Sequence, residues 1–88
     1  MKVVVSPKAE KQLKKLAKLD QIAVLRKIRG LVKSARISQE EKLGGYRGAY
    51  RVRVGNIRVV YLKLPDKFYV VLIAHRREIY LLLKRLWG

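Results

Sequence analysis

The sequence predicts an α+β domain: an antiparallel sheet with an N-terminal helical hairpin packed on it and a short C-terminal helix. Three observations support this class. A β-branched run and two amphipathic helical patterns fill the N-terminal part, three apolar or alternating runs follow, and a last amphipathic pattern ends the chain. With 88 residues, 50% of them hydrophobic, the chain is expected to form one domain, residues 1–88, around one core.

The N-terminal part opens with the β-branched run Lys2–Val5, which predicts a short strand. Ser6 and Pro7 then predict a helix start, because serine is a good N-cap and proline is tolerated at the first helical position. The expected apolar positions of this helix are Ala9, Leu13, Leu16 and Ala17. The chain is expected to turn at Leu19 and Asp20, where Asp20 can cap a second helix. The expected apolar stripe of that helix is Ile22, Leu25, Ile28, Val32 and Ala35.

The stretch from Ala49 to Leu62 predicts a β-hairpin. Gly55 and Asn56 suit a two-residue turn that needs positive φ, so the residues on either side pair across it. Side chains alternate between the faces of a strand, and the pairing therefore sorts the hairpin into two faces. The core face is expected to hold Tyr50, Val52, Val54, Ile57, Val59 and Tyr61. The opposite face is expected to hold Arg51, Arg53, Arg58 and Val60.

The three arginines of that opposite face indicate a surface that binds an anion. Arg53 and Arg58 are expected to face each other, which costs up to roughly 1 kcal/mol as a like-charge pair. No Asp or Glu occurs between Lys42 and Pro65 to offset the charge. The alternative is a solvated strand face, since arginine is usually exposed. Convergent guanidinium groups suit phosphate best, and the sequence therefore predicts a phosphate-binding face.

The remaining segments complete the predicted sheet and its cover. Residues 36–48, which include three glycines, are expected to form a connector. The apolar run Phe68–Ala74 predicts a strand that is buried on both faces and hence central. His75, Arg76 and Arg77 are expected to end this strand, and Glu78–Trp87 to form the closing helix.

The charge balance restricts the possible partners. Lys and Arg number 22 against six Asp and Glu, a net charge of +16, which implies a polyanionic partner: nucleic acid, an acidic protein or an anionic membrane. The absence of cysteine excludes disulfides and thiol chemistry and is typical of a reducing cytoplasm. No signal peptide is expected, and the apolar run at residues 79–83 is far shorter than the ~20 residues of a membrane span. One histidine and no cysteine predict no metal site, and nothing indicates a cofactor.

Two segments resemble the RelE/ParE superfamily of bacterial and archaeal toxins. The first is LGGYRGAYRVRVG at residues 43–55 with RVVY at 58–61, and the second is HRREIY at 75–80. The similarity also covers the opening strand and the helical hairpin. The resemblance implies a small α+β toxin with an acidic, RelB-like cognate antitoxin in the cytoplasm. RelE-like members cut mRNA in the ribosomal A site, whereas ParE-like members poison DNA gyrase and generally lack the basic catalytic set.

The resemblance also implies a set of catalytic residues. Carried over to this chain, the RelE-like site falls on Arg51, Arg53, Arg58, Arg76 and Tyr80. Three of these are the arginines that strand alternation already groups, which favours a RelE-like endoribonuclease. Such an enzyme works with the ribosome and has the 2′-hydroxyl of the mRNA attack the adjacent phosphate. The alternatives are a ParE-like gyrase inhibitor and a basic nucleic-acid-binding module without catalysis.

The general base of such a reaction stays open. The best-known RelE-like member has lysines where this chain has Arg51 and Arg53, and an arginine effectively cannot lose its proton. The remaining candidates are His75, Tyr80 and Glu78. Some relatives use a histidine near this end, and histidine is the natural proton carrier near neutral pH. Each candidate also has a purely structural interpretation: His75 can simply end the strand, Tyr80 can be a packing aromatic, and Glu78 can lie in the first turn of the helix.

A second basic surface is predicted along the first helix. Its expected members are Lys8, Lys11, Lys14, Lys15 and Lys18. Glu10 is the one acid nearby, which favours RNA docking through phosphate contacts over a solvated helix face. Arg47 in the connector is a further expected RNA contact.

Overall fold

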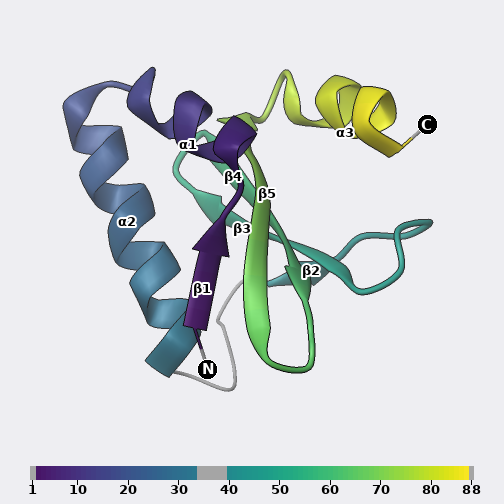
Figure 1. Ribbon diagram of the computed structural model, residues 1–88. Coiled ribbons are helices and arrows are strands. Elements are labelled where there is room, and N and C mark those ends of the chain that lie inside the picture. Colours follow the sequence, from purple (N-terminus) through teal and green to yellow (C-terminus); the bar gives the residue numbers. More distant parts are fainter. Residues whose placement is uncertain (1, 34–39, 88) are drawn as a thin grey trace.

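The structure, a computed structural model, describes residues 2–33 and 40–87. Its centre is one five-stranded sheet in the order β1-β5-β4-β3-β2. Figure 1 shows α1 and α2 on one side of this sheet and α3 on the other. The predicted α+β class is thereby confirmed, including the helical hairpin on the sheet and the short C-terminal helix. The elements are β1 (Lys2–Val5), α1 (Pro7–Lys14), α2 (Lys18–Lys33), β2 (Glu41–Lys42), β3 (Ala49–Val54), β4 (Ile57–Lys63), β5 (Lys67–His75) and α3 (Ile79–Trp87).

The sheet differs from the expected antiparallel one in a single pairing. β2, β3, β4 and β5 pair antiparallel in sequence order, but β1 pairs parallel with β5, with Val3 opposite Phe68. Short turns force neighbouring strands to be antiparallel, and the β3–β4 and β4–β5 connections are short. β1 is instead followed by the whole helical hairpin, so no short turn determines whether β1 runs parallel or antiparallel to its neighbour. Strand alternation in the sequence carries no information about that direction.

The helical hairpin begins as predicted and turns earlier than predicted. The Ser6 hydroxyl accepts a hydrogen bond from the Ala9 amide at 3.1 Å and caps α1. The chain then turns at residues 15–17, and α2 starts at Lys18, so Asp20 lies in its first turn instead of capping it. The Gln21 side-chain amide donates to the Leu16 carbonyl at 2.8 Å. It also donates to the Lys14 carbonyl at 3.3 Å, which the end of α1 leaves open, so one side chain joins the start of α2 to the turn and to α1.

The buried stripe of α2 is also different from the expected one. Val24, Ile28 and Leu31 are buried against the sheet, whereas Ile22 and Leu25 remain 42% and 36% exposed. Both sets have helical spacing and share Ile28, so the apolar arc of α2 is wider than the surface that the sheet can cover. Two further expected positions, the side chain of Val32 and the residue Ala35, lie outside the described part. In the first helical segment Ala9 is buried, Leu13 and Leu16 are half-buried, and Ala17 is exposed in the turn.

The β3–β4 hairpin has the predicted register throughout. Tyr50 faces Tyr61, Val52 faces Val59, and Arg53 faces Arg58. Gly55 opens the turn with a φ of 58°, a value at which glycine avoids the cost of a side chain. The core face of the hairpin packs against α1 and α2, as expected. The other face, which carries the three arginines, shares its side of the sheet with α3.

β5 is buried on both faces, as its apolar run predicts, and contributes side chains to both cores, but the central strand of the sheet is β4, and β5 lies between β4 and β1. Val60 faces Leu72 while Tyr61 faces Val70, so Val71 is an extra residue that forms a bulge. The bulge turns both Val71 and Leu72 toward the second core, under Ile79 and Leu83 of α3. Within the described residues, no helix is long and apolar enough to cross a membrane.

Candidate active site

The basic residues of the hairpin and of the turn after β5 surround one open depression of about 520 Å³. We call it the arginine depression, and it is lined by Arg51, Arg53, Arg58, Arg76, Arg77 and Tyr80. The backbone amide of Arg76 donates to the Asn56 carbonyl at 2.8 Å, which ties the turn after β5 to the hairpin turn. The structure thus brings together all five residues that the resemblance implied. Their catalytic roles stay a prediction.

Arg58 is the fixed member of the cluster. It is only 7% exposed, and its Nη1 donates to the backbone carbonyls of Gly55 at 3.0 Å and Ile57 at 3.2 Å. Burial, followed by the charges of Arg53, Arg51 and Arg76, lowers the pKa of Arg58. A positive charge held under these conditions is stabilised by any anion that enters the depression.

Arg51 joins the cluster to a carboxylate and to an aromatic ring. Its Nη2 lies 2.6 Å from a carboxylate oxygen of Glu41, and its Cζ lies 5.3 Å from the ring centre of Tyr80. The side chain of Arg51 is 17% exposed, and its buried Nε has no hydrogen-bond partner among the described residues. Tyr80 itself is 56% exposed, so one face of the site carries an aromatic ring that is open to solvent.

Glu41 is the functional candidate that the sequence analysis missed. It lies in β2, which pairs with β3 so that Glu41 is opposite Arg51. A strand of two residues has no detectable alternation, and the segment was expected to be part of a connector. The available signal was an acidic pair, Glu40 and Glu41, just before a stretch without acids.

Glu40, the neighbour of Glu41, is bound on the opposite face of the sheet. It accepts a short hydrogen bond from the Tyr61 hydroxyl and lies 2.7 Å from the Lys63 ammonium. Tyr61 is completely buried in the core under the helical hairpin. Its burial, and next the hydrogen bond to Glu40, raise the pKa of Tyr61. The Lys63 ammonium also lies 4.2 Å from the ring centre of Tyr50.

The two other proposed proton carriers lie beside the depression. His75 and Glu78 are exposed and line a separate hollow of about 300 Å³ together with Asn56. This hollow shares Arg76 and Arg77 with the arginine depression as a common wall. Among the three predicted candidates for the base, only Tyr80 lines the depression itself.

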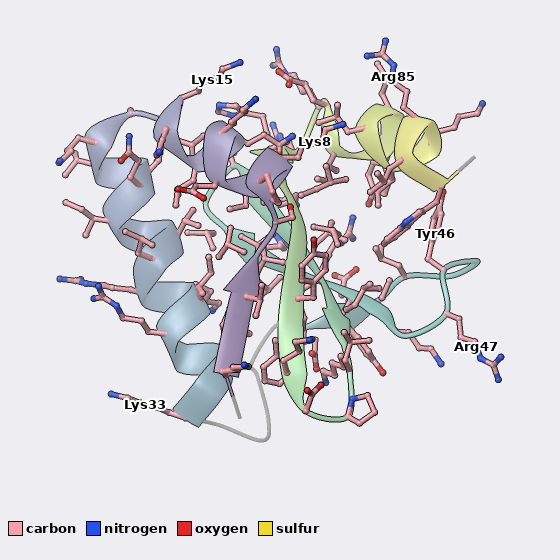
Figure 2. All side chains as sticks on the ribbon, in the orientation of Figure 1. Lys8, Lys15, Lys33, Tyr46, Arg47 and Arg85 are labelled. Atoms are coloured by element: carbon pink, nitrogen blue, oxygen red, sulfur yellow. The ribbon has the colours of Figure 1, made fainter. Side chains whose placement is uncertain are left out.

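The predicted basic helix surface is divided between two elements. Lys8, Lys11 and Lys14 belong to α1, whereas Lys15 lies in the turn and Lys18 begins α2. All five are exposed, and Lys14 pairs with Glu10 at 3.4 Å. Figure 2 shows Lys8 and Lys15 projecting into solvent from this end of the molecule, and Arg47 projecting from the loop between β2 and β3. Their contact with RNA stays a prediction.

Solved structures of small toxins share this fold. A chain of the RelB-RelE antitoxin-toxin complex from Methanococcus jannaschii superposes with a TM-score of 0.76 at 24% identity, covering 88% of this chain and 94% of that one. The isolated E. coli RelE toxin gives 0.72 at 23% identity over 96% of both chains. The YoeB/ParE toxin from Agrobacterium tumefaciens gives 0.72 at 18% identity, covering 86% and 99%. At such identities the likeness shows the fold alone.

The sequence itself identifies the family. The model for the ParE toxin of type II toxin-antitoxin system, parDE, matches residues 3–80, and the chain belongs to this family. No curated protein matches the sequence. The protein is therefore a toxin of a type II toxin–antitoxin system with a RelE-like fold.

Proposed function

We propose that this toxin is a ribosome-dependent mRNA endoribonuclease and that the arginine depression holds the scissile phosphate. The observation that carries the proposal is the set of five arginines around one open depression with an exposed tyrosine at its rim. Guanidinium groups bind phosphate through paired hydrogen bonds, and an aromatic ring stacks on unpaired bases. Both features suit a single-stranded RNA whose phosphate enters the depression.

The reaction has the 2′-oxygen form a bond to phosphorus while the bond from phosphorus to the 5′-oxygen breaks. Charge builds up on the phosphate oxygens in the transition state, and preorganised donors stabilise it. Arg58 is suited to this role because its side chain is already held by two backbone carbonyls. Arg53 lies opposite it and is free to approach a second phosphate oxygen.

The proton carriers that this reaction needs are available on two sides of the depression. The Glu41 carboxylate, bound to Arg51, can accept the proton of the 2′-hydroxyl. Arg76 separates the depression from His75, which can supply a proton to the departing 5′-oxygen. In-line displacement places the attacking and leaving oxygens on opposite sides of phosphorus. Glu41 lies in the hollow that adjoins the depression at Arg51, and His75 lies in the hollow that adjoins it at Arg76, so the two carriers approach the depression from two different neighbouring hollows.

An acidic, RelB-like antitoxin is the partner that we propose in the cell, with the ribosome and mRNA as targets in the cytoplasm. Solved relatives include RelB-RelE complexes, and a net charge of +16 favours an acidic protein. α2 also leaves Leu19, Ile22 and Leu25 exposed by 80%, 42% and 36%. These side chains offer apolar contacts to an amphipathic antitoxin helix.

Inhibition of DNA gyrase is the second candidate, since the matching family model describes ParE toxins. Primer extension on mRNA bound to purified ribosomes, beside a gyrase supercoiling assay, separates the two functions. The ribonuclease is expected to produce new 5′ ends within ribosome-bound mRNA and to leave supercoiling unaffected. Arg53→Ala should reduce the new ends on the order of a hundredfold, whereas Arg29→Ala, which removes an exposed charge from α2, should not reduce them. Intact mRNA with blocked supercoiling would establish the gyrase function instead.

A further inference from the structure

The arginine depression is the first of three neighbouring hollows on the α3 side of the molecule. The second hollow, of about 300 Å³, shares Arg51 and Tyr80 with the depression and extends to Tyr46. The third, of about 350 Å³, shares Tyr46 with the second and ends at Arg47 and Trp87. Hollows that share lining residues are neighbours, so an extended ligand can contact all three in order.

The far end of this series is an aromatic surface beside a positive charge. The rings of Tyr46 and Trp87 lie 5.1 Å apart at an angle of 40°, and Trp87 remains 36% exposed at the end of α3. Arg47 follows Tyr46 in the loop and is exposed. Figure 2 shows Tyr46 directed toward α3 and Arg47 projecting from the same loop.

We propose that a single-stranded RNA segment leaves the arginine depression along this series and that Tyr46, Trp87 and Arg47 form a second nucleotide-binding subsite. The proposal rests on the proposed function, because it supplies the contacts for nucleotides next to the scissile phosphate. Cations combined with aromatic rings are typical of surfaces that bind single strands, since every base has a face that can stack. Along the three hollows the rings of Tyr80 and Tyr46 lie between two cations, Arg51 and Arg47.

The subsite is expected to hold a base by stacking and a neighbouring phosphate by charge. Stacking and charge act on any nucleotide, so the contribution of the subsite should be independent of sequence. A purely structural interpretation is that Trp87 only anchors the end of α3 to the loop through Tyr46. The two interpretations differ in whether a bound RNA changes the environment of Trp87.

Trp87 makes this difference measurable because it is the only tryptophan of the chain. We would titrate the full chain with a single-stranded 2′-O-methyl oligoribonucleotide of six residues, which cannot be cleaved, and record tryptophan fluorescence. The oligonucleotide is expected to quench the fluorescence in a saturable manner. Inorganic phosphate, which has no base to stack on Tyr46 or Trp87, should leave the fluorescence unchanged.

Variants then test the individual residues. Tyr46→Leu retains an apolar side chain but loses stacking, and is expected to weaken binding by roughly tenfold. Arg47→Ala should weaken binding and reduce the slope of log affinity against log salt by about 1. Lys33→Ala removes an equal charge from the end of α2 and should have neither effect. Because Arg47 is exposed, its replacement keeps the test informative if Tyr46→Leu unfolds.

The outcomes separate this inference from the proposed function. Absent quenching, or quenching by phosphate alone, would overturn the second subsite even if ribosome-bound mRNA is cleaved. Quenching that depends on Arg47, with mRNA left intact, would support the subsite while the ribonuclease proposal fails. Equal losses for Arg47→Ala and Lys33→Ala would show general charge attraction and would also overturn the subsite.

Discussion

Two neighbouring residues of β3 allow the two faces of the hairpin to be tested separately. Arg53 is exposed, faces Arg58 and lines the arginine depression. Arg53→Ala removes one member of a like-charge pair that costs up to roughly 1 kcal/mol, so the free energy of unfolding should stay within about 0.5 kcal/mol of wild type or rise. Cleavage of ribosome-bound mRNA should fall on the order of a hundredfold, as for the loss of a transition-state donor.

Val52→Ala, one residue earlier, should have the opposite effects. Val52 is fully buried opposite Val59 in the core beneath the helical hairpin. The substitution deletes two methyl groups at about 0.8 kcal/mol each and leaves a cavity, for a total cost of roughly 2–3 kcal/mol. In a domain of this size the melting temperature should fall by roughly 10–20 °C. Cleavage per folded molecule, assayed well below that temperature, should match wild type.

A thermal melt and a ribosome-dependent cleavage assay on both variants decide the question. If Arg53→Ala lowers the melting temperature while Val52→Ala leaves it unchanged, the two faces have been exchanged, because a slip of one residue turns every side chain over. If both variants retain full cleavage, the arginine depression is not the active site. Either result would refute the reasoning that connects strand alternation to catalysis.

Ribosome-bound mRNA should be cut much faster than free RNA, because holding the 2′-oxygen in line with the phosphate supplies several kcal/mol; equal rates would contradict this. Glu41→Gln keeps the contact with Arg51 but loses the proton acceptor, so cleavage should fall by roughly a hundredfold while Glu78→Gln stays active; full activity of Glu41→Gln would remove Glu41 from the mechanism. Since the pKa of Tyr61 is raised above 10.0, the folded state keeps its proton where the unfolded chain ionises. The stability that Tyr61 contributes is therefore fully present below pH 10. Above pH 10 the free energy of unfolding should decline by up to about 1.4 kcal/mol per pH unit relative to Tyr61→Phe; parallel stability curves of the two proteins in denaturant titrations would disprove the shift in pKa.

The hairpin could be predicted from sequence because its signals agree with one another. A two-residue turn fixes the register, and alternation over six residue pairs then assigns each side chain to a face. The grouping of Arg51, Arg53 and Arg58 follows from this alone. The addition of Arg76 and Tyr80 came from the family resemblance, because nothing local indicates that the turn after β5 folds back to the hairpin turn through Asn56.

Other features could not be predicted because they depend on long-range packing. α2 has two overlapping apolar stripes, and only the shape of the sheet decides that Val24 and Leu31 are buried while Ile22 and Leu25 are exposed. Strand alternation places Arg58 on the arginine face but does not reveal that it is only 7% exposed there. β2 is too short for any periodic signal, and with it Glu41 was overlooked.

The adjacent residues Glu40 and Glu41 connect the core to the proposed chemistry. In an extended segment successive side chains point to opposite faces, so an anchor on one residue orients the next. Glu40 is held by the buried Tyr61 and by Lys63, and Glu41 consequently points to the other face of the sheet, at Arg51. A two-residue edge strand has little pairing of its own to fix its position. The carboxylate that we propose as the base is thus oriented by a tyrosine from the opposite side of the sheet, which explains why a buried polar contact is present in an otherwise apolar core.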